Sequence, residues 1–417
     1  MRIIVLGTSP FVIDSRGRLI SWILEHFKNS EHEVAAIVWN HNIEYLVPET
    51  TEKGPVWFYE CASDEGPKRV RIFPLLPEKD RAAMVHDLLS FLKPDVLLTV
   101  GDVSDFVYLP ALKQFYSGDL RWLFVATNYS LPLSGDYLDI VRAADHIVST
   151  NRATVSSLEA SSCIENVTYI SPGYNEMDFY QDDVHDHDGQ ELRIMASGKN
   201  LQTDNLAAAM EAVQISRSRG IDAKLYVHSN VTDLGDYDFN ALKDRFDGPE
   251  AYIRFPERFV SIYDGISQQE MRNELNWADV FLSTSVVSAT SMSAMEAVAC
   301  GAFPLMSHCG SNSELAGDLE KSSEGMIKTQ DLLVKTTRFM TKGGVYLNIC
   351  DPKDVADKLV RLNRFFRNRQ GRREVLEQSR LRLKSSRRAF LDALSSLVDE
   401  VGNREQAMCL ETITGGS

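Results

Sequence analysis

Residues 291–305 read SMSAMEAVACGAFPL, and this stretch decides the fold of the second half of the chain. Serine favours the start of a helix, apolar residues follow at helical spacing, and Gly301 offers a left-handed C-terminal stop. A new apolar run begins at Phe303, which predicts helix, turn and strand in that order. Glu296 interrupts the apolar run, and a carboxylate there is unfavourable unless it is exposed or hydrogen-bonded.

Strand and helix patterns alternate outward from this stretch in both directions, which predicts parallel sheets covered on both faces. In the first half, strands are expected at 2–7, 33–39, 95–101, 122–127 and 146–150, and helices at 19–27, 81–93 and 138–144. In the second half, strands are expected at 193–198, 223–229, 251–255, 279–285 and 302–306, and helices at 205–220, 269–278 and 291–300. The sequence therefore predicts an α/β protein with two Rossmann-like, doubly wound domains facing a cleft.

The length and composition of the chain agree with two domains, and its net charge argues against some classes of binding partner. The chain has 417 residues, 44% of them hydrophobic, which is enough for two cores. A formal net charge of −15 argues against nucleic acid or anionic lipid as the main binding partner. The most basic stretch, residues 361–387, has leucine, phenylalanine and valine at helical spacing and is expected to form a solvated helix face.

Cysteine spacing and hydropathy indicate the compartment. Six cysteines lie far apart without a CxxC pair, which predicts reduced thiols, a cytoplasmic location and no metal site. No apolar stretch reaches the about 18 residues that a membrane-spanning helix needs, so no transmembrane segment is expected.

Polar residues fall where the expected strands end, which is where ligands bind in doubly wound sheets. Ser197 and Gly198 close one strand, and His228 closes the next. The helix that begins near Ser291 is expected to present the backbone amides of Thr290, Ser291 and Met292, a suitable site for a diphosphate.

The element order and several segments resemble the retaining nucleotide-sugar glycosyltransferases of the GT-B fold, the glycogen-synthase-like, group 1 enzymes. The segments are ADHIVSTNRATVSSL at 144–158, ADVFLSTS at 278–285 and AMEAVACGAFPLMSHCGSNSEL at 294–315. In that family the last segment carries two glutamates, and Glu296 matches the second. The resemblance implies that Glu296 accepts hydrogen bonds from the ribose hydroxyls of a UDP- or GDP-linked donor sugar, with no further cofactor.

The resemblance also implies a domain plan. The first domain, residues 1–176, would bind the acceptor, and residues 177–191 would form a linker. Residues 192–370 would bind the nucleotide sugar, and C-terminal helices in 371–417 would pack partly on the first domain.

Three positions of the second half depart from the family pattern. Ser288 stands where the first glutamate is expected, so the contact to the sugar would be a hydroxyl. Lys199 stands in place of an arginine and Asp204 in place of a lysine. Lys199 and the helix amides would then neutralise the departing diphosphate without a metal ion.

In the first half, Gly17 matches the family's glycine before the first helix, and Arg16 beside it would add positive charge near the donor. Asn128 stands beside Thr127, where many members carry a histidine. The reaction in this family is usually described as front-face attack, in which the leaving phosphate oxygen takes the acceptor proton, so the missing histidine does not exclude activity.

Three functions remain open. The first is transfer of a sugar, with retention, to a small molecule, lipid-linked glycan or protein whose identity the sequence leaves unknown. The second is transfer to a hydroxymethylated base in DNA, as in phage DNA glucosyltransferases, which resemble the same family. Epimerisation of a nucleotide sugar is a separate, smaller alternative. The third is nucleotide-sugar binding with lost or altered catalysis, suggested by Ser288 and Asp204.

Overall fold

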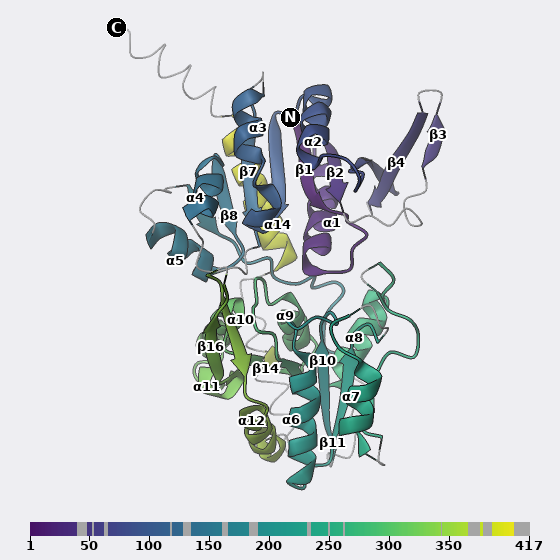
Figure 1. Cartoon of the computed structure of the whole chain (residues 1–417), viewed down its shortest axis with the longest axis vertical. Coiled ribbons are helices and arrows are strands. Elements are labelled where there is room, and N and C mark those ends of the chain that lie inside the picture. The colour runs from purple at the N-terminus through teal and green to yellow at the C-terminus, as the bar shows by residue number, and fades with distance from the viewer. Residues whose placement is uncertain are drawn as a thin grey trace. The chain divides into compact units, whose positions relative to one another are not determined.

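The structure is a computed structural model (Figure 1). It describes the chain except residues 40–47, 52–53, 62–65, 117–118, 128–134, 161–165, 183–190, 232–234, 249–250, 262, 343, 366–375, 378–385 and 404–417. The chain forms two compact units, Met1–Ser171 with Arg388–Ser417, and Pro172–Arg387. No helix in the described part of the chain is long and apolar enough to cross a bilayer.

The first unit is built on a nine-stranded sheet of order β3-β4-β5-β2-β1-β6-β7-β8-β9. Its strands are β1 (Arg2–Thr8), β2 (Glu33–Trp39), β3 (Glu49–Thr51), β4 (Gly54–Cys61), β5 (Lys68–Pro74), β6 (Val96–Gly101), β7 (Arg121–Ala126), β8 (His146–Ser149) and β9 (Val167–Tyr169). Its helices are α1 (Ser15–Lys28), α2 (Arg81–Leu92), the short 3₁₀ helix η1 (Val103–Phe106), α3 (Leu109–Phe115), α4 (Gly135–Arg142), α5 (Arg152–Ala160) and α14 (Arg387–Gly402).

Helices cover both faces of this sheet, as side-chain alternation along β1 shows. Ile4 and Leu6 belong to a core with Val85 of α2 and Leu112 of α3. Alternate residues of a strand point to opposite faces, so buried Ile3 lies on the other face.

The sequence did not predict the antiparallel edge of this sheet. β5 pairs with β2 in parallel, but β4 pairs with β5, and β3 with β4, in antiparallel fashion. Residues 62–67, which join β4 to β5, are too few for the crossover that a parallel pair needs. The expectation of a fully parallel first sheet was therefore wrong at this edge.

The second unit is built on a six-stranded sheet of order β12-β11-β10-β13-β14-β15. Its strands are β10 (Leu192–Ser197), β11 (Ala223–His228), β12 (Ile253–Arg254), β13 (Val280–Ser283), β14 (Phe303–Ser307) and β15 (Leu333–Val334), and β16 (Thr336–Met340) forms an antiparallel hairpin with β17 (Tyr346–Cys350). Its helices are α6 (Leu206–Ser218), α7 (Phe239–Phe246), α8 (Gln268–Trp277), α9 (Met292–Ala299), α10 (Gly310–Ser322), α11 (Thr329–Leu332) and α12 (Pro352–Phe365).

All pairs in the six-stranded sheet are parallel, and its centre follows the predicted pattern. Gly301 ends α9 with φ +84°, the left-handed conformation predicted from the sequence. The chain runs from β10 outward to β12 and then returns to β13 on the other side of β10. This reversal makes the gap between the carboxyl ends of β10 and β13 the topological switch point of the second unit, and β1 and β6 flank that of the first.

The chain just before β10 packs on α8. Phe179 is 1% exposed, and the Arg272 guanidinium lies 4.2 Å from the centre of the Tyr180 ring. The Asn276 side chain accepts from the Asp182 amide at 2.9 Å and donates to the Tyr180 carbonyl at 3.1 Å. Residues 178–182 of the segment expected as a linker are thus ordered against the second unit.

Helix α14 packs within the first unit, although residues 170–386, 217 in number, separate it from β9. Its side chains Phe390, Leu394 and Val398 are fully buried. Asp399 lies 3.5 Å from His32, and a Cβ on Gly402 would lie 2.3 Å from the Met1 sulfur. The C-terminal helix therefore completes the core of the unit that the N-terminus begins.

We predict that Phe390→Ala lowers the free energy of unfolding of the first unit by about 3–5 kcal/mol, because it leaves a cavity in a closed core. Phe115→Ala is the matched control; Phe115 is 76% exposed, and its loss should change stability by less than about 0.5 kcal/mol. Urea titrations followed by circular dichroism measure both. Equal losses for the two variants would mean that α14 does not contribute to the core.

Candidate functional site

The turn after β10 brings Ser197, Gly198 and Lys199 to the switch point of the second unit. The Gly198 amide donates to the carbonyl of His228 at 3.2 Å, which joins the ends of β10 and β11. The Lys199 side chain is exposed, and its backbone amide donates to Asp204 Oδ2 at 3.1 Å. A Cβ on Gly198 would lie 2.9 Å from the Asp204 side chain, so only glycine fits this turn without a shift.

Asp204 ties the loop after β10 to the loop after β13. Burial raises the pKa of the Asp204 carboxyl group above its usual value. The hydrogen bond from the Lys199 amide, the Lys199 charge and the Ser285 hydroxyl offset part of this rise. The Val286 amide adds a hydrogen bond to the Thr203 carbonyl at 2.8 Å. The two loops that border the switch point are therefore held together by Asp204 and its neighbours.

Three hydroxyls meet where the loop after β13 reaches α10. The oxygen of Ser311 lies 2.8 Å from those of both Ser288 and Ser291, which are themselves 3.2 Å apart. Ser291 Oγ also donates to Asn312 Oδ1 at 2.8 Å. We call Ser288, Ser291 and Ser311 the serine cluster.

Helices α9 and α10 both begin at the serine cluster. Ser291 precedes α9 in the left-handed conformation, with φ +48° and without a side-chain cap. The Ser311 amide donates to the Ser288 carbonyl at 3.2 Å, and a Cβ on Gly310 would lie 2.1 Å from that carbonyl oxygen. Two helix N-termini, each with a partial positive charge, thus converge on neutral hydroxyls, which is an arrangement that suits an anion.

The side chains around the start of α9 are buried. Thr290 is 8% and Met292 2% exposed, so these two residues offer a ligand their backbone amides and little of their side chains. Glu296, one turn further on, is 2% exposed, and its negative charge contributes with burial to raising the pKa of the Cys300 thiol. Two roles fit this burial: an acceptor for the protein's own donors, or an acceptor for ligand hydroxyls.

His228 is neutral at the end of β11. Burial lowers its pKa to about 4, opposed by the charge of Glu274. Its Nδ1 lies 3.2 Å from the hydroxyl of Tyr226. The adjacent Ser229 is 4% exposed, and its hydroxyl finds no hydrogen-bond partner within the described chain. The end of β11 therefore offers polar groups without charge.

In the first unit, Gly17 and Arg16 begin α1 beside the switch point. Asp14 Oδ1 accepts from the amides of both residues, at 3.0 Å from Arg16 and 2.9 Å from Gly17. A Cβ on Gly17 would lie 1.9 Å from the Val12 carbonyl oxygen, so glycine is required there. Arg16 Nη1 donates to Asp105 Oδ2 at 3.2 Å, which links the loops after β1 and β6.

Two buried hydroxyls follow β6 and β7. The hydroxyls of Tyr108 and Thr127 have no hydrogen-bond partner among the residues that the structure describes. Burial raises the pKa of Tyr108, so its phenol stays protonated. Asn128, which the sequence suggested as a catalytic residue, lies outside the described residues.

Among the described residues, no three His, Cys, Asp or Glu side chains are placed to hold a metal ion. The four described cysteines are buried and free, and burial raises the pKa of Cys309 to about 11 and those of Cys61 and Cys350 to about 12. These thiols stay protonated near neutral pH and are poor nucleophiles.

The ends of β10 and β11, the loops after β10 and β13, and helix α9 carry the residues predicted for the second unit. Gly17 and Arg16 belong to the first unit. Sequence reasoning missed Ser311 and Asn312, which complete the polar cluster, and Asp105, which pairs with Arg16. The signal for the first two was present, because CGSN at 309–312 begins two residues after the last residue of β14 and opens a helix.

Solved structures share this fold over almost the whole chain. Sucrose-phosphate synthase from Thermosynechococcus elongatus is 13% identical, with a TM-score of 0.68 over 96% of this chain and 99% of that one. A Burkholderia xenovorans trehalose-phosphate synthase (UDP-forming), in complex with glucose-6-phosphate, is 10% identical, with a TM-score of 0.64 over 96% and 100%. A structure described as trehalose-6-phosphate from E. coli bound with UDP-2-fluoro glucose is 11% identical, with a TM-score of 0.62 over 96% and 99%.

The sequence itself matches no family model, and no curated protein is significantly similar to it. The structural likeness nevertheless confirms the predicted fold: the chain has the GT-B fold that these solved structures share.

We predict that His228→Gln flattens the dependence of stability on pH. The folded protein keeps His228 neutral down to about pH 4, whereas the unfolded chain takes up a proton below about pH 6.5. The stability from neutral His228 is therefore complete above pH 6.5 and is lost as the pH falls toward 4, by up to about 1.4 kcal/mol per pH unit. Thermal unfolding between pH 7.5 and 4.5 measures this slope.

Tyr226→Phe is the control for this experiment, because it removes the phenol next to the ring and keeps the titrating group. It should retain most of the wild-type slope. A slope in His228→Gln as steep as that of the wild type would show that His228 titrates normally in the folded protein.

Proposed function

We propose that the protein is a retaining glycosyltransferase that moves a sugar from a nucleoside-diphosphate sugar, UDP- or GDP-linked, to an acceptor hydroxyl. One observation carries the proposal: the N-termini of α9 and α10 and the turn of Gly198 and Lys199 border the same switch point, in a chain with the GT-B fold. Doubly wound sheets bind their ligands at such points.

The diphosphate is assigned to the start of α9, with Lys199 on the opposite side. Helix amides stabilise phosphate oxygens without a side-chain charge, and the exposed Lys199 ammonium adds one cation. The Ser288 hydroxyl, held by Ser291 and Ser311, would contact the transferred sugar. This arrangement supports charge neutralisation without a metal ion.

In the proposed reaction, the bond between the anomeric carbon and the diphosphate oxygen breaks as the acceptor oxygen bonds to the same face of that carbon. The acceptor proton passes to the departing diphosphate oxygen, so no protein base is required. Catalysis then rests on positioning and on stabilising the negative charge that develops on the leaving group.

The acceptor is assigned to the first unit, where Gly17 and the pair of Arg16 and Asp105 border the other switch point. Acceptors with a sugar or sugar-phosphate group are the first candidates, because the similar Burkholderia synthase was solved with glucose-6-phosphate. The free thiols of the described cysteines support a cytoplasmic setting.

The direct test is a panel of UDP-, GDP- and ADP-sugars screened for thermal stabilisation, followed by a transfer assay with the sugar that stabilises most. A donor at 100 times its dissociation constant should add about 2.7 kcal/mol of stability. Stabilisation without transfer to any acceptor or to water would favour the binding protein that has lost catalysis. Absence of stabilisation by every donor would reject both functions.

We predict that Glu296→Ala weakens binding of that donor by about 1.5–3 kcal/mol, the worth of hydrogen bonds to a charged group. Isothermal titration calorimetry measures the affinity, and circular dichroism checks that the variant folds. Glu257→Ala removes an exposed glutamate of the same unit and should bind as the wild type does. A folded Glu296→Ala protein with unchanged affinity would assign the buried carboxylate a structural role.

We further predict that Lys199→Ala slows transfer about 10- to 1000-fold, as expected when one preorganised stabiliser of developing charge is lost. Donor binding should change less, because Lys199 acts mainly on the leaving group. Lys321→Ala, which removes an exposed lysine of α10, serves as the control. Wild-type turnover in Lys199→Ala would show that Lys199 does not stabilise the leaving group.

A further inference from the structure

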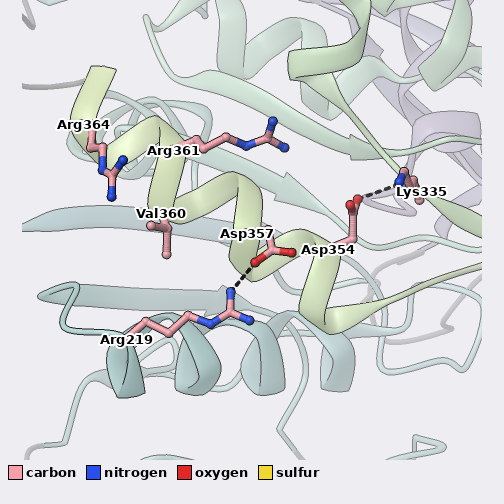
Figure 2. Close-up of a pocket in the computed structure, with 7 residues that line it drawn as sticks. All are labelled: Arg219, Lys335, Asp354, Asp357, Val360, Arg361 and Arg364. Carbon is pink, nitrogen blue, oxygen red and sulfur yellow. Dashed lines mark hydrogen bonds and ion pairs between the residues drawn. The ribbon is translucent and has the colours of Figure 1, made fainter.

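The second unit contains a pocket of about 550 Å³ away from the serine cluster (Figure 2). It is lined by Arg219, Lys335, Asp354, Asp357, Val360, Arg361 and Arg364. Arg219 follows the C-terminus of α6, Lys335 follows β15, and the other five residues belong to α12. Lys199 precedes the opposite end of α6, and a helix of 13 residues is about 20 Å long, so this pocket is distinct from the proposed donor site.

The acidic residues of the pocket already have partners. Arg219 Nη1 lies 2.6 Å from Asp357 Oδ1, and Asp354 Oδ2 accepts from the Lys335 backbone amide at 2.9 Å (Figure 2). Arg361 and Arg364, in contrast, form no hydrogen bond or ion pair with any residue in the described part of the chain. The pocket therefore holds two exposed guanidinium groups whose charge is not matched by a carboxylate.

Both arginines line the same pocket. Arg361 and Arg364 are three residues apart on α12, and their side chains leave the helix in different directions (Figure 2). Their five N–H donors each, in a planar fork, match the oxygens of a phosphate group in bidentate fashion.

A buried lysine of α12 lies beside the pocket. Lys358 on α12 is 7% exposed, and its ammonium donates to the Gln330 carbonyl. Burial lowers the pKa of Lys358, and the charges of Arg361 and Lys335 lower it further, against the effect of Asp354 and Asp331. The Lys358 ammonium is thus repelled by Arg361 and Lys335 and attracted by Asp354 and Asp331.

We propose that this pocket binds a phosphate-bearing small molecule through Arg361 and Arg364, at a site separate from the one for the sugar donor. A volume of 550 Å³ lies within the range of about 300–1,000 Å³ that ligand pockets occupy. Asp354 and Asp357 would repel an extended polyanion, and their carboxylates can accept hydrogen bonds from hydroxyls on the same ligand. Since the whole chain carries a net charge of −15, attraction of anions depends on this local cluster.

The test is a calorimetric titration of the full chain with inorganic pyrophosphate at low salt, with the variant Arg361→Gln/Arg364→Gln alongside. Each lost hydrogen bond to a charged group weakens binding about tenfold or more, so the double variant should raise the dissociation constant at least about tenfold. The matched control is Arg338→Gln/Lys342→Gln, which removes the same two positive charges from exposed positions in and beside β16. It should bind pyrophosphate as the wild type does.

Lys199→Ala separates this inference from the proposed function, because pyrophosphate can also enter the donor site. If Lys199→Ala removes one class of pyrophosphate sites and Arg361→Gln/Arg364→Gln removes the other, the result supports both the proposed donor site and the pocket beside α12. Binding that only Lys199→Ala abolishes would overturn the inference and leave the proposed function standing. No binding to the wild type, or binding only to vesicles that contain phosphatidic acid, would also overturn it.

Discussion

Parallel strands that are buried on both faces leave polar side chains few places other than the strand ends. β6 is buried at every residue, and β10 and β13 are buried at all but a few positions. An unpaired polar group inside such a sheet would lose its hydrogen bonds to water, so hydroxyls, carboxylates and cations gather in the loops. The position of both candidate sites follows from this constraint, because the loops that meet at a switch point face no covering helix.

Asp204 shows how far this site has diverged from the pattern that its sequence resembles. A carboxylate occupies the position expected for a lysine, yet it organises the site, since it accepts from the Lys199 amide and interacts with Ser285 across the switch point. The exchange removes one cation and adds rigidity to the loop that carries the remaining one. In the first unit, Asp105 likewise pairs with Arg16 and offsets its charge. Under the proposed function, the two helix N-termini at the serine cluster would be the main source of positive potential for a diphosphate.

The two proposals thus place two different means of holding phosphate within one strongly acidic chain. At the serine cluster, backbone amides and hydroxyls meet without a matching side-chain charge. In the pocket beside α12, arginine side chains supply full charges at positions exposed to solvent. Amides at a helix start are fixed in place and suit a leaving group whose charge develops during a reaction, whereas exposed arginines suit a ligand that binds and leaves unchanged.

The sequence by itself determined the central strands, the helices between them and the turn at Gly301, because these depend on residues close together in the chain. It also indicated the strand ends at Ser197 and His228 as polar positions. Only the tertiary structure decided that Ser311 completes the serine cluster, that Phe179 is buried and that β4 runs antiparallel to β5. The tertiary structure alone also places Arg219 in contact with Asp357, which lies 138 positions further along the chain, and this contact helps to form the pocket beside α12. Local patterns set which elements form, but such long-range contacts depend on strand order and helix packing, which no single segment encodes.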